Sequence, residues 1–178
     1  MPRGFLDQLR SFTHEATDVE PVSLRISSRL SVEQQKLQSL SFLAAVTRTF
    51  GEVQYNFRYL GSIRELLANA FDASDPHPVV EITATTRNGP NGKRMLVTTV
   101  TDSGSGFPEK MLQPGFFSSE IISKKKDSWM HGGRGKGLFL LQSFVNAVDG
   151  TLVLANKPEG GGAVVTFSIP HEKSGYRF

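Results

Sequence analysis

The amino-acid sequence predicts one domain of the α/β (α+β) class, built from five strands and three helices. Helix and strand patterns follow one another in the order strand, helix, helix, strand, strand, helix, strand, strand. The chain of 178 residues is long enough to bury a hydrophobic core without disulfides or a structural metal ion. It contains no cysteine, which excludes disulfides, thiolate zinc sites and cysteine nucleophiles.

Composition also limits the cellular setting. No apolar run approaches the roughly 20 residues of a membrane span, and the first residues lack the apolar region of a signal peptide. The missing cysteines fit a reducing compartment, so we expect a soluble cytoplasmic protein with no membrane partner. A net charge of +3 is mild and does not indicate a nucleic-acid partner.

The first expected elements are a strand and a helix, which follow a weakly patterned lead-in at residues 1–20. Residues 22–27 alternate apolar and polar side chains, which indicates a half-buried strand. Ser31 is a typical N-cap and Gly51 a typical stop, so a helix is predicted between them. The residues predicted to form its apolar stripe are Leu37, Leu40, Leu43, Ala44, Thr47 and Phe50. We also assign Phe42, Phe50 and Phe57 to the core.

A second helix and a β-hairpin are predicted next. The helix covers residues 56–73 and ends before Asp75-Pro76, because proline disfavours helix in the residue before it. Residues 79–86 and 95–101 read as strands joined by a turn with two Asn-Gly pairs at residues 87–92. The predicted apolar stripe of the helix comprises Leu60, Ile63, Leu67, Ala70 and Phe71.

The chain then changes character. Residues 103–137 are rich in glycine and serine and show no sustained period, and the segment is too long for an ordinary connection. We therefore expect it to be functional or mobile. A third helix is predicted at residues 138–148, and strands at 151–155 and 163–169 are separated by a glycine turn at 160–162.

Three polar side chains share one face of the second helix. Glu65, Asn69 and Asp72 stand at positions i, i+4 and i+7, which places them within a sector of roughly 60° opposite the apolar stripe. A solvated surface is the ordinary interpretation of such a face when it is taken alone.

An acidic residue and two glycines follow the third predicted strand. Asp102 stands at the strand end, and Gly104 and Gly106 would let the backbone approach a ligand closely. The carboxylate would remain free to accept a hydrogen bond. Taken alone, this motif is also compatible with a simple Asx turn.

A glycine loop at residues 131–137 leads directly into the third helix. Its backbone N–H groups and the helix N-terminus would form an anion site, to which Arg134 and Lys136 add positive charge. A flexible linker is the alternative interpretation. No Gly-Lys-Ser/Thr occurs, so this is not a Walker loop, and the dinucleotide fingerprint would need a strand immediately before it.

Together, the three motifs resemble the nucleotide-binding boxes of the GHKL superfamily, named for gyrase, the Hsp90 chaperones, histidine kinases and MutL. They occur in the same order and roughly thirty residues apart. Residues 65–73 match the N box, residues 102–107 the first glycine box and residues 133–138 the second. Residues 114–119 resemble the F box of the mobile ATP lid, and residues 161–170 resemble the closing strand.

This resemblance implies a Bergerat-type ATP-binding fold. That fold is a two-layer sandwich with a mixed, mostly antiparallel sheet and three helices on one face. The ATP-binding domain would then cover residues 21–172, leaving a tail at 173–178.

The resemblance also assigns roles to individual residues. Asn69 would hold Mg²⁺ between the phosphates, Asp102 would accept the adenine amino group, and Gly104 and Gly106 would line the base pocket. Glu65 would be either a general base or a carboxylate that orients the acceptor, and both roles stay open. The further residues that would contact ATP are Asp72, Phe107, Phe117, Gly133, Arg134, Gly135, Lys136, Gly137 and Leu138.

One position departs from the family pattern. Ala163 and Val164 occupy the part of the closing strand where many relatives have a threonine near the aspartate that binds adenine. A second adenine contact from this strand is therefore not expected.

The layout is similar to the free-standing anti-sigma-factor kinases, which phosphorylate a serine of an antagonist protein. The length leaves no room for the transducer domain of gyrase or MutL relatives. The ATP-binding domain of a sensor histidine kinase is the second interpretation, and His14 is then a candidate acceptor, although a plain surface histidine is the default and no helical hairpin fits before Asn69. A nucleotide-gated binding module without phosphotransfer is the third.

These interpretations imply ATP and Mg²⁺ as cofactors and a protein as the partner. The partner would be an antagonist and a sigma factor, or a response regulator, and a homodimer stays open. Lys124 to Lys126 are interpreted as a solvated run, with phosphate or an acidic partner as the alternative.

Overall fold

The computed structural model of the chain describes residues 19–74, 76–89, 92–113, 116 and 136–171. The three main helices are α2 (Val32–Phe50), α3 (Asn56–Ala73) and α5 (Lys136–Ala147). A short 3-10 helix, η2, covers Glu109–Met111. The strands are β1 (Val22–Ile26), β2 (Val80–Asn88), β3 (Arg94–Thr101), β4 (Thr151–Asn156) and β5 (Ala163–Pro170).

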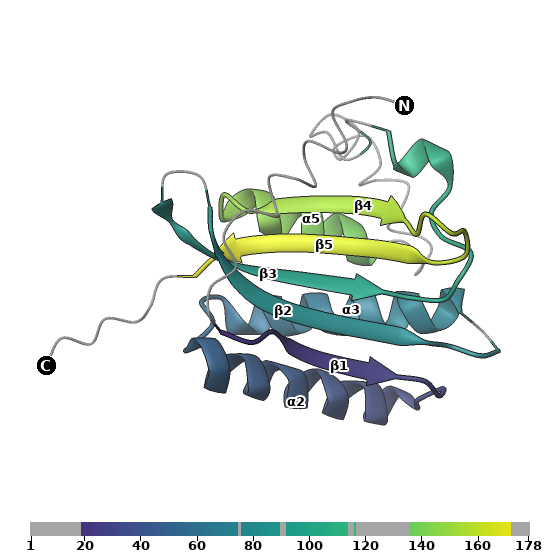
Figure 1. Cartoon of the computed structure of the whole chain (residues 1–178), viewed down its shortest axis with the longest axis horizontal. Helices are drawn as coiled ribbons and strands as arrows, with labels where there is room; N and C mark the ends of the chain where they lie inside the picture. Colours follow the sequence, from purple (N-terminus) through teal and green to yellow (C-terminus); the bar gives the residue numbers. More distant parts are fainter. Residues whose placement is uncertain (1–18, 75, 90–91, 114–115, 117–135, 172–178) are drawn as a thin grey trace, which may run out of the picture.

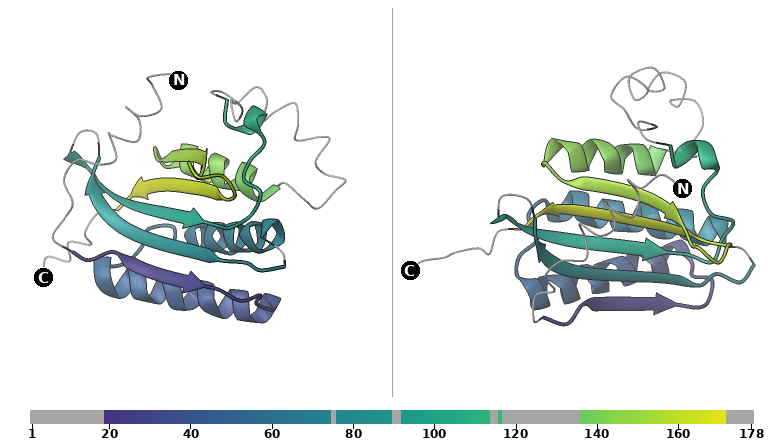
Figure 2. Two further views of the ribbon diagram at one scale, coloured as in Figure 1. Left: turned by 45° about the vertical axis from the view of Figure 1, so that its right-hand side comes forward. Right: turned by 45° about the horizontal axis from the view of Figure 1, so that its top comes forward.

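The strands form one sheet whose helices lie on a single face, as Figures 1 and 2 show. The strand order is β1-β2-β3-β5-β4, and every pairing is antiparallel. The two-layer α/β arrangement with three helices is confirmed. The sheet that the structure describes is antiparallel throughout, whereas we expected a mixed, mostly antiparallel sheet.

The core lies between the sheet and the helices and is formed by alternate residues of the central strands. On β2, Ile82 is fully buried and stands opposite Val100 of β3. Leu96 of β3 stands opposite Ile169 of β5 in the same way. From the helix layer, Val46 of α2 is fully buried against this face. This alternation is the period-two pattern of a sheet with one covered face.

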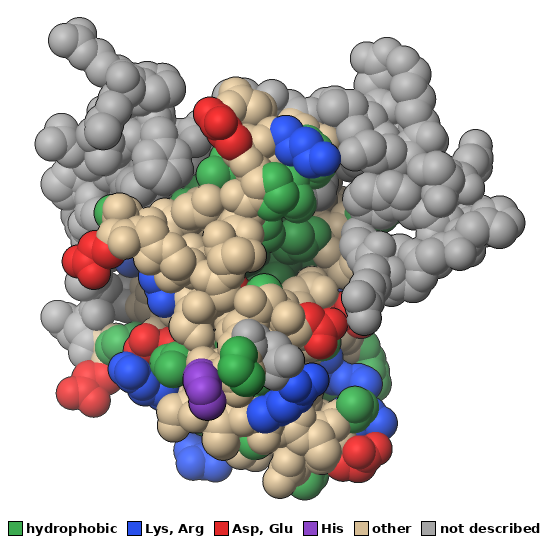
Figure 3. Space-filling model, turned by 90° about the vertical axis from the view of Figure 1, so that its right-hand side faces the viewer, with side chains coloured by type: hydrophobic (Ala, Val, Ile, Leu, Met, Phe, Trp, Pro, Cys, Tyr) green, Lys and Arg blue, Asp and Glu red, His purple; other side chains and the backbone are tan. Residues whose placement is uncertain are grey.

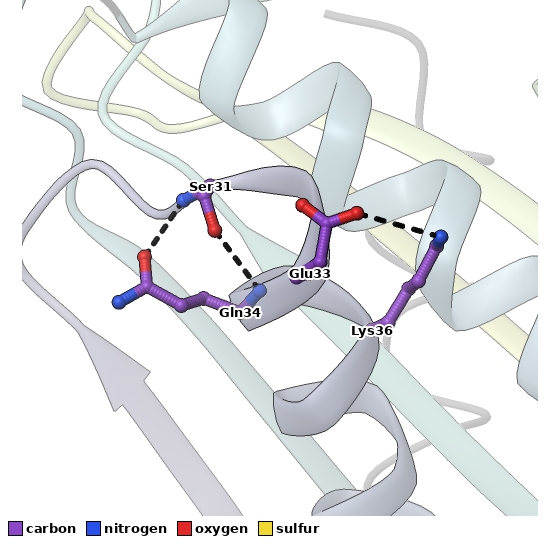
Figure 4. Close-up of polar contacts among 4 residues, drawn as sticks. All are labelled: Ser31, Glu33, Gln34 and Lys36. Carbon is purple, nitrogen blue, oxygen red and sulfur yellow. Dashed lines mark hydrogen bonds and ion pairs between the residues drawn. The ribbon is translucent and has the colours of Figure 1, made fainter.

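Helix α2 begins where the sequence predicted, at a capping box. The Ser31 hydroxyl accepts a hydrogen bond from the Gln34 main-chain N at 3.2 Å, and the Gln34 side chain accepts one from the Ser31 main-chain N at 2.8 Å (Figure 4). These two bonds satisfy backbone donors that the first helical turn leaves free. Gly51 ends the helix with a φ of 97°, a conformation that favours glycine.

The predicted core face of α2 is largely wrong. Leu37, Leu40, Ala44 and Thr47 are exposed, whereas Leu43 is partly buried. The buried residues of this helix are Ser39, Phe42, Val46 and Phe50. Apolar side chains occur on two faces of α2, and helical spacing alone does not reveal which face meets the sheet. The core assignment of Phe57 is also wrong, because this side chain is 87% exposed at the start of α3.

The remaining predicted elements are confirmed with small shifts in their bounds. Helix α3 has the predicted bounds, and its predicted stripe is buried, except that Leu60 is half-buried. Strand β2 extends two residues further than expected, so the turn begins at Gly89. Helix α5 begins at Lys136, two residues early, which places Gly137 inside the helix. None of the described helices has the length and apolar character needed to cross a membrane.

Candidate functional site

The start of α5 lies against the polar face of α3. A Cβ atom placed on Gly137 would lie 2.8 Å from Glu65 Oε2 and 3.4 Å from Asn69 Nδ2. Glu65 and Asn69 are both exposed, so they stand at the surface beside the first turn of α5. The positive dipole end of that turn favours an anion there. Two of the predicted motifs are thus in contact.

Asp102 is held at the end of β3 with only 7% of its surface exposed. Its Oδ1 accepts hydrogen bonds from the main-chain N of Gly104 at 2.8 Å and of Ala163 at 3.0 Å. Its Oδ2 accepts none from the residues that the structure describes. One carboxylate oxygen is therefore fixed by the backbone, while the other retains its capacity as an acceptor.

The loop after Asp102 packs tightly on the end of α3. A Cβ atom placed on Gly104 would lie 2.6 Å from the carbonyl oxygen of Ala73, so only glycine fits there. Ser103 ties the same loop to the start of β2, because its hydroxyl accepts a hydrogen bond from Val79 N at 2.9 Å. Asp72 is exposed in the last turn of α3, next to this contact.

Two residues that the sequence analysis missed also hold this loop. Asn156, at the end of β4, accepts a hydrogen bond from Phe107 N at 2.7 Å and donates one to Phe107 O at 2.9 Å. Lys157 donates a hydrogen bond from its ammonium group to the main-chain carbonyl of Asp102. An Asn-Lys pair before a glycine turn is ordinary in a hairpin, and only the pairing of β4 with β5 brings it beside Asp102.

Gly106 shows why the loop needs glycine beside Asn156. Its φ is 79°, and a Cβ atom there would lie 2.7 Å from Asn156 Oδ1.

Figure 3 views the end of the molecule where α3, β3 and this loop terminate, and it shows a hollow with hydrophobic side chains along its wall. The shape is that of a partly apolar cleft.

Not every predicted residue can be placed in the site. Leu138 and Phe107 are half-buried and pack against the hydrophobic core. Phe117, Gly133, Arg134 and Gly135 lie outside the described residues, as do His14 and Lys124 to Lys126. Lys136 is the first residue of α5, but its side chain is not among the parts that the structure describes. Within the described part of the chain, no three acidic or histidine side chains form a group that could hold a metal ion.

Residues 61–173 match the family described as "Histidine kinase-, DNA gyrase B-, and HSP90-like ATPase". The chain belongs to this family. The match includes the polar face of α3, the Asp102 loop and α5, so the site lies within the family domain. The expected membership of the GHKL superfamily is confirmed, and ATP is the nucleotide that this ATPase family binds. The closer resemblance to anti-sigma-factor kinases is not confirmed.

Several solved structures are similar to this member of the histidine kinase-like ATPase family. The mycobacterial sensor histidine kinase MprB is 17% identical with a TM-score of 0.47, covering 85% of this chain and 97% of its own. The catalytic domain of histidine kinase ThkA is 15% identical with a TM-score of 0.46, covering 86% and 99%. The histidine kinase domain of the blue-light activated kinase of Erythrobacter litoralis is 16% identical with a TM-score of 0.42, covering 93% and 69%. No curated protein matches the chain.

Proposed function

We propose that this chain is a Mg²⁺- and ATP-dependent protein kinase that transfers the γ-phosphoryl group to a serine of a partner protein. The observation that carries the proposal is the contact of the α5 N-terminus with Glu65 and Asn69. It places a carboxylate and a side-chain amide beside a helix end whose dipole favours anions, and phosphoryl transfer depends on such positioning and charge stabilisation.

The residues of the site suit ATP and Mg²⁺. Asp102 would accept the adenine amino group at Oδ2, because its other oxygen is already fixed by two backbone donors. Asn69 would ligate Mg²⁺ through its side-chain oxygen. A site with few protein ligands suits this ion, which keeps several waters and is completed by phosphate oxygens.

Glu65 would act on the acceptor side of the reaction. Its carboxylate is exposed beside the first turn of α5, where it could accept the proton of an incoming hydroxyl or orient that group. ATP supplies the phosphoryl group, and positioning and charge stabilisation supply most of the catalysis in this reaction class.

A histidine acceptor is the second candidate, because the family includes histidine kinases by name. The placement of residues 22–50 argues against His14 of this chain as the acceptor, and a serine or a histidine of a separate protein fits it equally well. These residues form the edge strand β1 and the helix α2, which belong to the ATP-binding domain and not to an acceptor hairpin. In the proposed assembly the chain binds a sigma factor and an antagonist protein in turn, and the acceptor serine belongs to the antagonist.

Glu65→Gln separates the proposed chemistry from nucleotide binding. The amide keeps the size of the side chain but cannot accept a proton, so transfer should fall by about 10²- to 10⁴-fold. ATP affinity should stay unchanged. Binding is measured by calorimetry and transfer by label from γ-labelled ATP, with Glu52→Gln at an exposed position outside the site as the matched control. An unchanged transfer rate in Glu65→Gln would contradict the assigned role.

The chemical stability of the labelled product identifies the acceptor. The purified chain is incubated with γ-labelled ATP, Mg²⁺ and the proteins encoded beside its gene. Label that survives acid on a second protein supports transfer to serine. Acid-labile label would instead indicate a histidine acceptor. Intact ATP binding without label on any protein would replace the kinase proposal with a nucleotide-gated binding module.

A further inference from the structure

The hydrogen-bond ladder between β3 and β5 departs from the regular pattern at Asp102. This residue continues β3 by one position and stands opposite Ala163, since Thr101 stands opposite Val164. In a hydrogen-bonded antiparallel pair, two opposite residues exchange both of their N–H···O=C bonds. The Asp102 main-chain N donates to the Ala163 carbonyl at 3.1 Å, but the Ala163 N donates to Asp102 Oδ1 at 3.0 Å. The carboxylate has therefore taken the place of its own main-chain carbonyl in the ladder.

This exchange leaves the main-chain carbonyl of Asp102 without its ladder donor. Asp102 is almost fully buried, so water reaches this residue poorly. A buried carbonyl without a donor destabilises a fold, and nearly all such groups find a partner. Here the ammonium group of Lys157 donates to the Asp102 carbonyl oxygen. Lys157 thus supplies the donor that the exchange removes.

The backbone and the stem of Lys157 are both held in place for this bond. Its main-chain N donates to Gly162 O at 3.0 Å, and its carbonyl accepts a hydrogen bond from Gly160 N at 3.2 Å. Its stem crosses Gly162, where a Cβ atom would lie 3.0 Å from Lys157 Cδ and would overlap the carbonyl oxygen of Asp102. The glycine, with a φ of 129°, leaves open the path that the lysine stem follows.

The turn between β4 and β5 does not itself require a lysine at position 157. The two backbone bonds of this position are available to any residue except proline. Lys157 is half-buried, and among the described residues it forms no ion pair. A half-buried ammonium group loses hydration without gaining a counter-charge, so the bond to the Asp102 carbonyl is the contact that accounts for it.

We infer that Lys157 is a positioning residue of the ATP site, which holds the main chain of Asp102 so that Oδ1 stays in the ladder and Oδ2 stays directed at adenine. Without Lys157, the carbonyl of Asp102 would compete for the Ala163 N–H, and the regular ladder bond would replace the bond to Oδ1. The carboxylate would then lose one of its two backbone donors and its fixed direction. The inference rests on the proposed function for the identity of the ligand.

The first test compares ATP with purine riboside triphosphate, which lacks the 6-amino group that Asp102 would accept. Both affinities are measured by calorimetry with Mg²⁺ on the full chain. The wild type should prefer ATP by at least about tenfold. Lys157→Met keeps a long stem but removes the donor, so it should weaken ATP about tenfold and purine riboside triphosphate less than about twofold. Lys157→Arg retains a charged donor and should keep the preference for ATP within about threefold of wild type.

A double-mutant cycle without nucleotide tests the contact itself. Lys157→Met should lower the melting temperature by about 3–6 °C, because the Asp102 carbonyl loses its donor. In Asp102→Ala the Ala163 N–H can return to that carbonyl, so adding Lys157→Met should cost less than about half as much. Lys93→Met, at an exposed position before the opposite end of β3, is the matched control and should change neither the melting temperature nor either affinity.

Three outcomes would overturn the inference. They are unchanged ATP affinity in Lys157→Met, equal weakening of the two nucleotides, and an equal loss of melting temperature with and without the Asp102 carboxylate. Equal weakening would mean that Lys157 acts on the ribose or phosphates that both nucleotides share. If the two substitutions are coupled in melting temperature but the wild type binds no ATP, Lys157 still holds Asp102 and the proposed function fails, so the two failures are distinguishable.

Discussion

Asp102 illustrates what can be predicted for a single residue. Its position after a strand and before alternate glycines left two interpretations open, a ligand-binding carboxylate and an Asx turn. The structure places Asp102 buried at that strand end, and the hydrogen bond from Gly104 N to its Oδ1 is the bond of an Asx turn. The backbone donors that fix it come from Gly104, two residues away, and from Ala163 in a distant strand. The local motif was therefore enough for the first contact, but only strand pairing supplies the second.

Asn156 provides a residue-scale prediction about the loop that carries Asp102. Asn156→Ala removes both hydrogen bonds to the Phe107 backbone, so the loop should lose its fixed conformation. Because each bond is near the surface, we expect ATP affinity to weaken by about three- to tenfold with little change in melting temperature. Calorimetry with Mg²⁺ and ATP measures this, and Asn88→Ala at the exposed end of β2 is the control. Unchanged ATP affinity in Asn156→Ala would contradict the role of Asn156 in fixing this loop.

At the scale of the element, the ends of the helices were easier to predict than their buried faces. Helix α2 begins after Ser31 and ends before Gly51, as expected, because caps depend on local backbone chemistry. The buried face was assigned to the wrong leucines, because α2 has apolar residues on its outer face as well. For α3 the bounds were predicted correctly, and the predicted stripe is buried except for the half-buried Leu60, although Phe57 at its start was wrongly assigned to the core.

The capping box of α2 yields a prediction at this scale. Ser31→Ala removes the side-chain acceptor of the Gln34 amide, which should cost about 1 kcal/mol and lower the melting temperature by about 2–4 °C. ATP affinity should not change, because α2 contributes no residue to the proposed nucleotide site. Ser41→Ala, exposed in the middle of the same helix, should not lower the melting temperature. A loss of the same size in both variants would contradict the capping interpretation.

At the scale of the whole molecule, the order of elements was enough to predict two layers. The strand order was not predictable from local patterns, because β5 lies between β3 and β4 through pairings between distant segments. The contact between layers includes one buried polar pair, in which the hydroxyl groups of Tyr59 on α3 and Thr98 on β3 lie 2.8 Å apart.

The burial of Tyr59 makes the stability of the domain depend on pH in the alkaline range. Burial raises the pKa of Tyr59 above its ordinary value of 10.0, so the folded state keeps the phenol neutral where the unfolded state ionises it. The stabilising contribution is complete below pH 10 and declines above it. Tyr59→Phe lacks this ionisation, so the stability difference from wild type should shrink between about pH 9 and about pH 11. Urea unfolding at both values measures it, and a constant difference would contradict the assignment.

The central claim is that the Asp102 loop, α3 and the start of α5 form one ATP site. Calorimetry with millimolar ATP and Mg²⁺ tests it most directly. We predict binding to the wild type and at least about tenfold weaker binding to Asp102→Asn, because a hydrogen bond to a charged group contributes about 1.5–3 kcal/mol. Asp149→Asn is the matched control, since Asp149 is exposed and its φ of 55° suits asparagine. No heat with the wild type, or equal affinity in Asp102→Asn, would contradict the account.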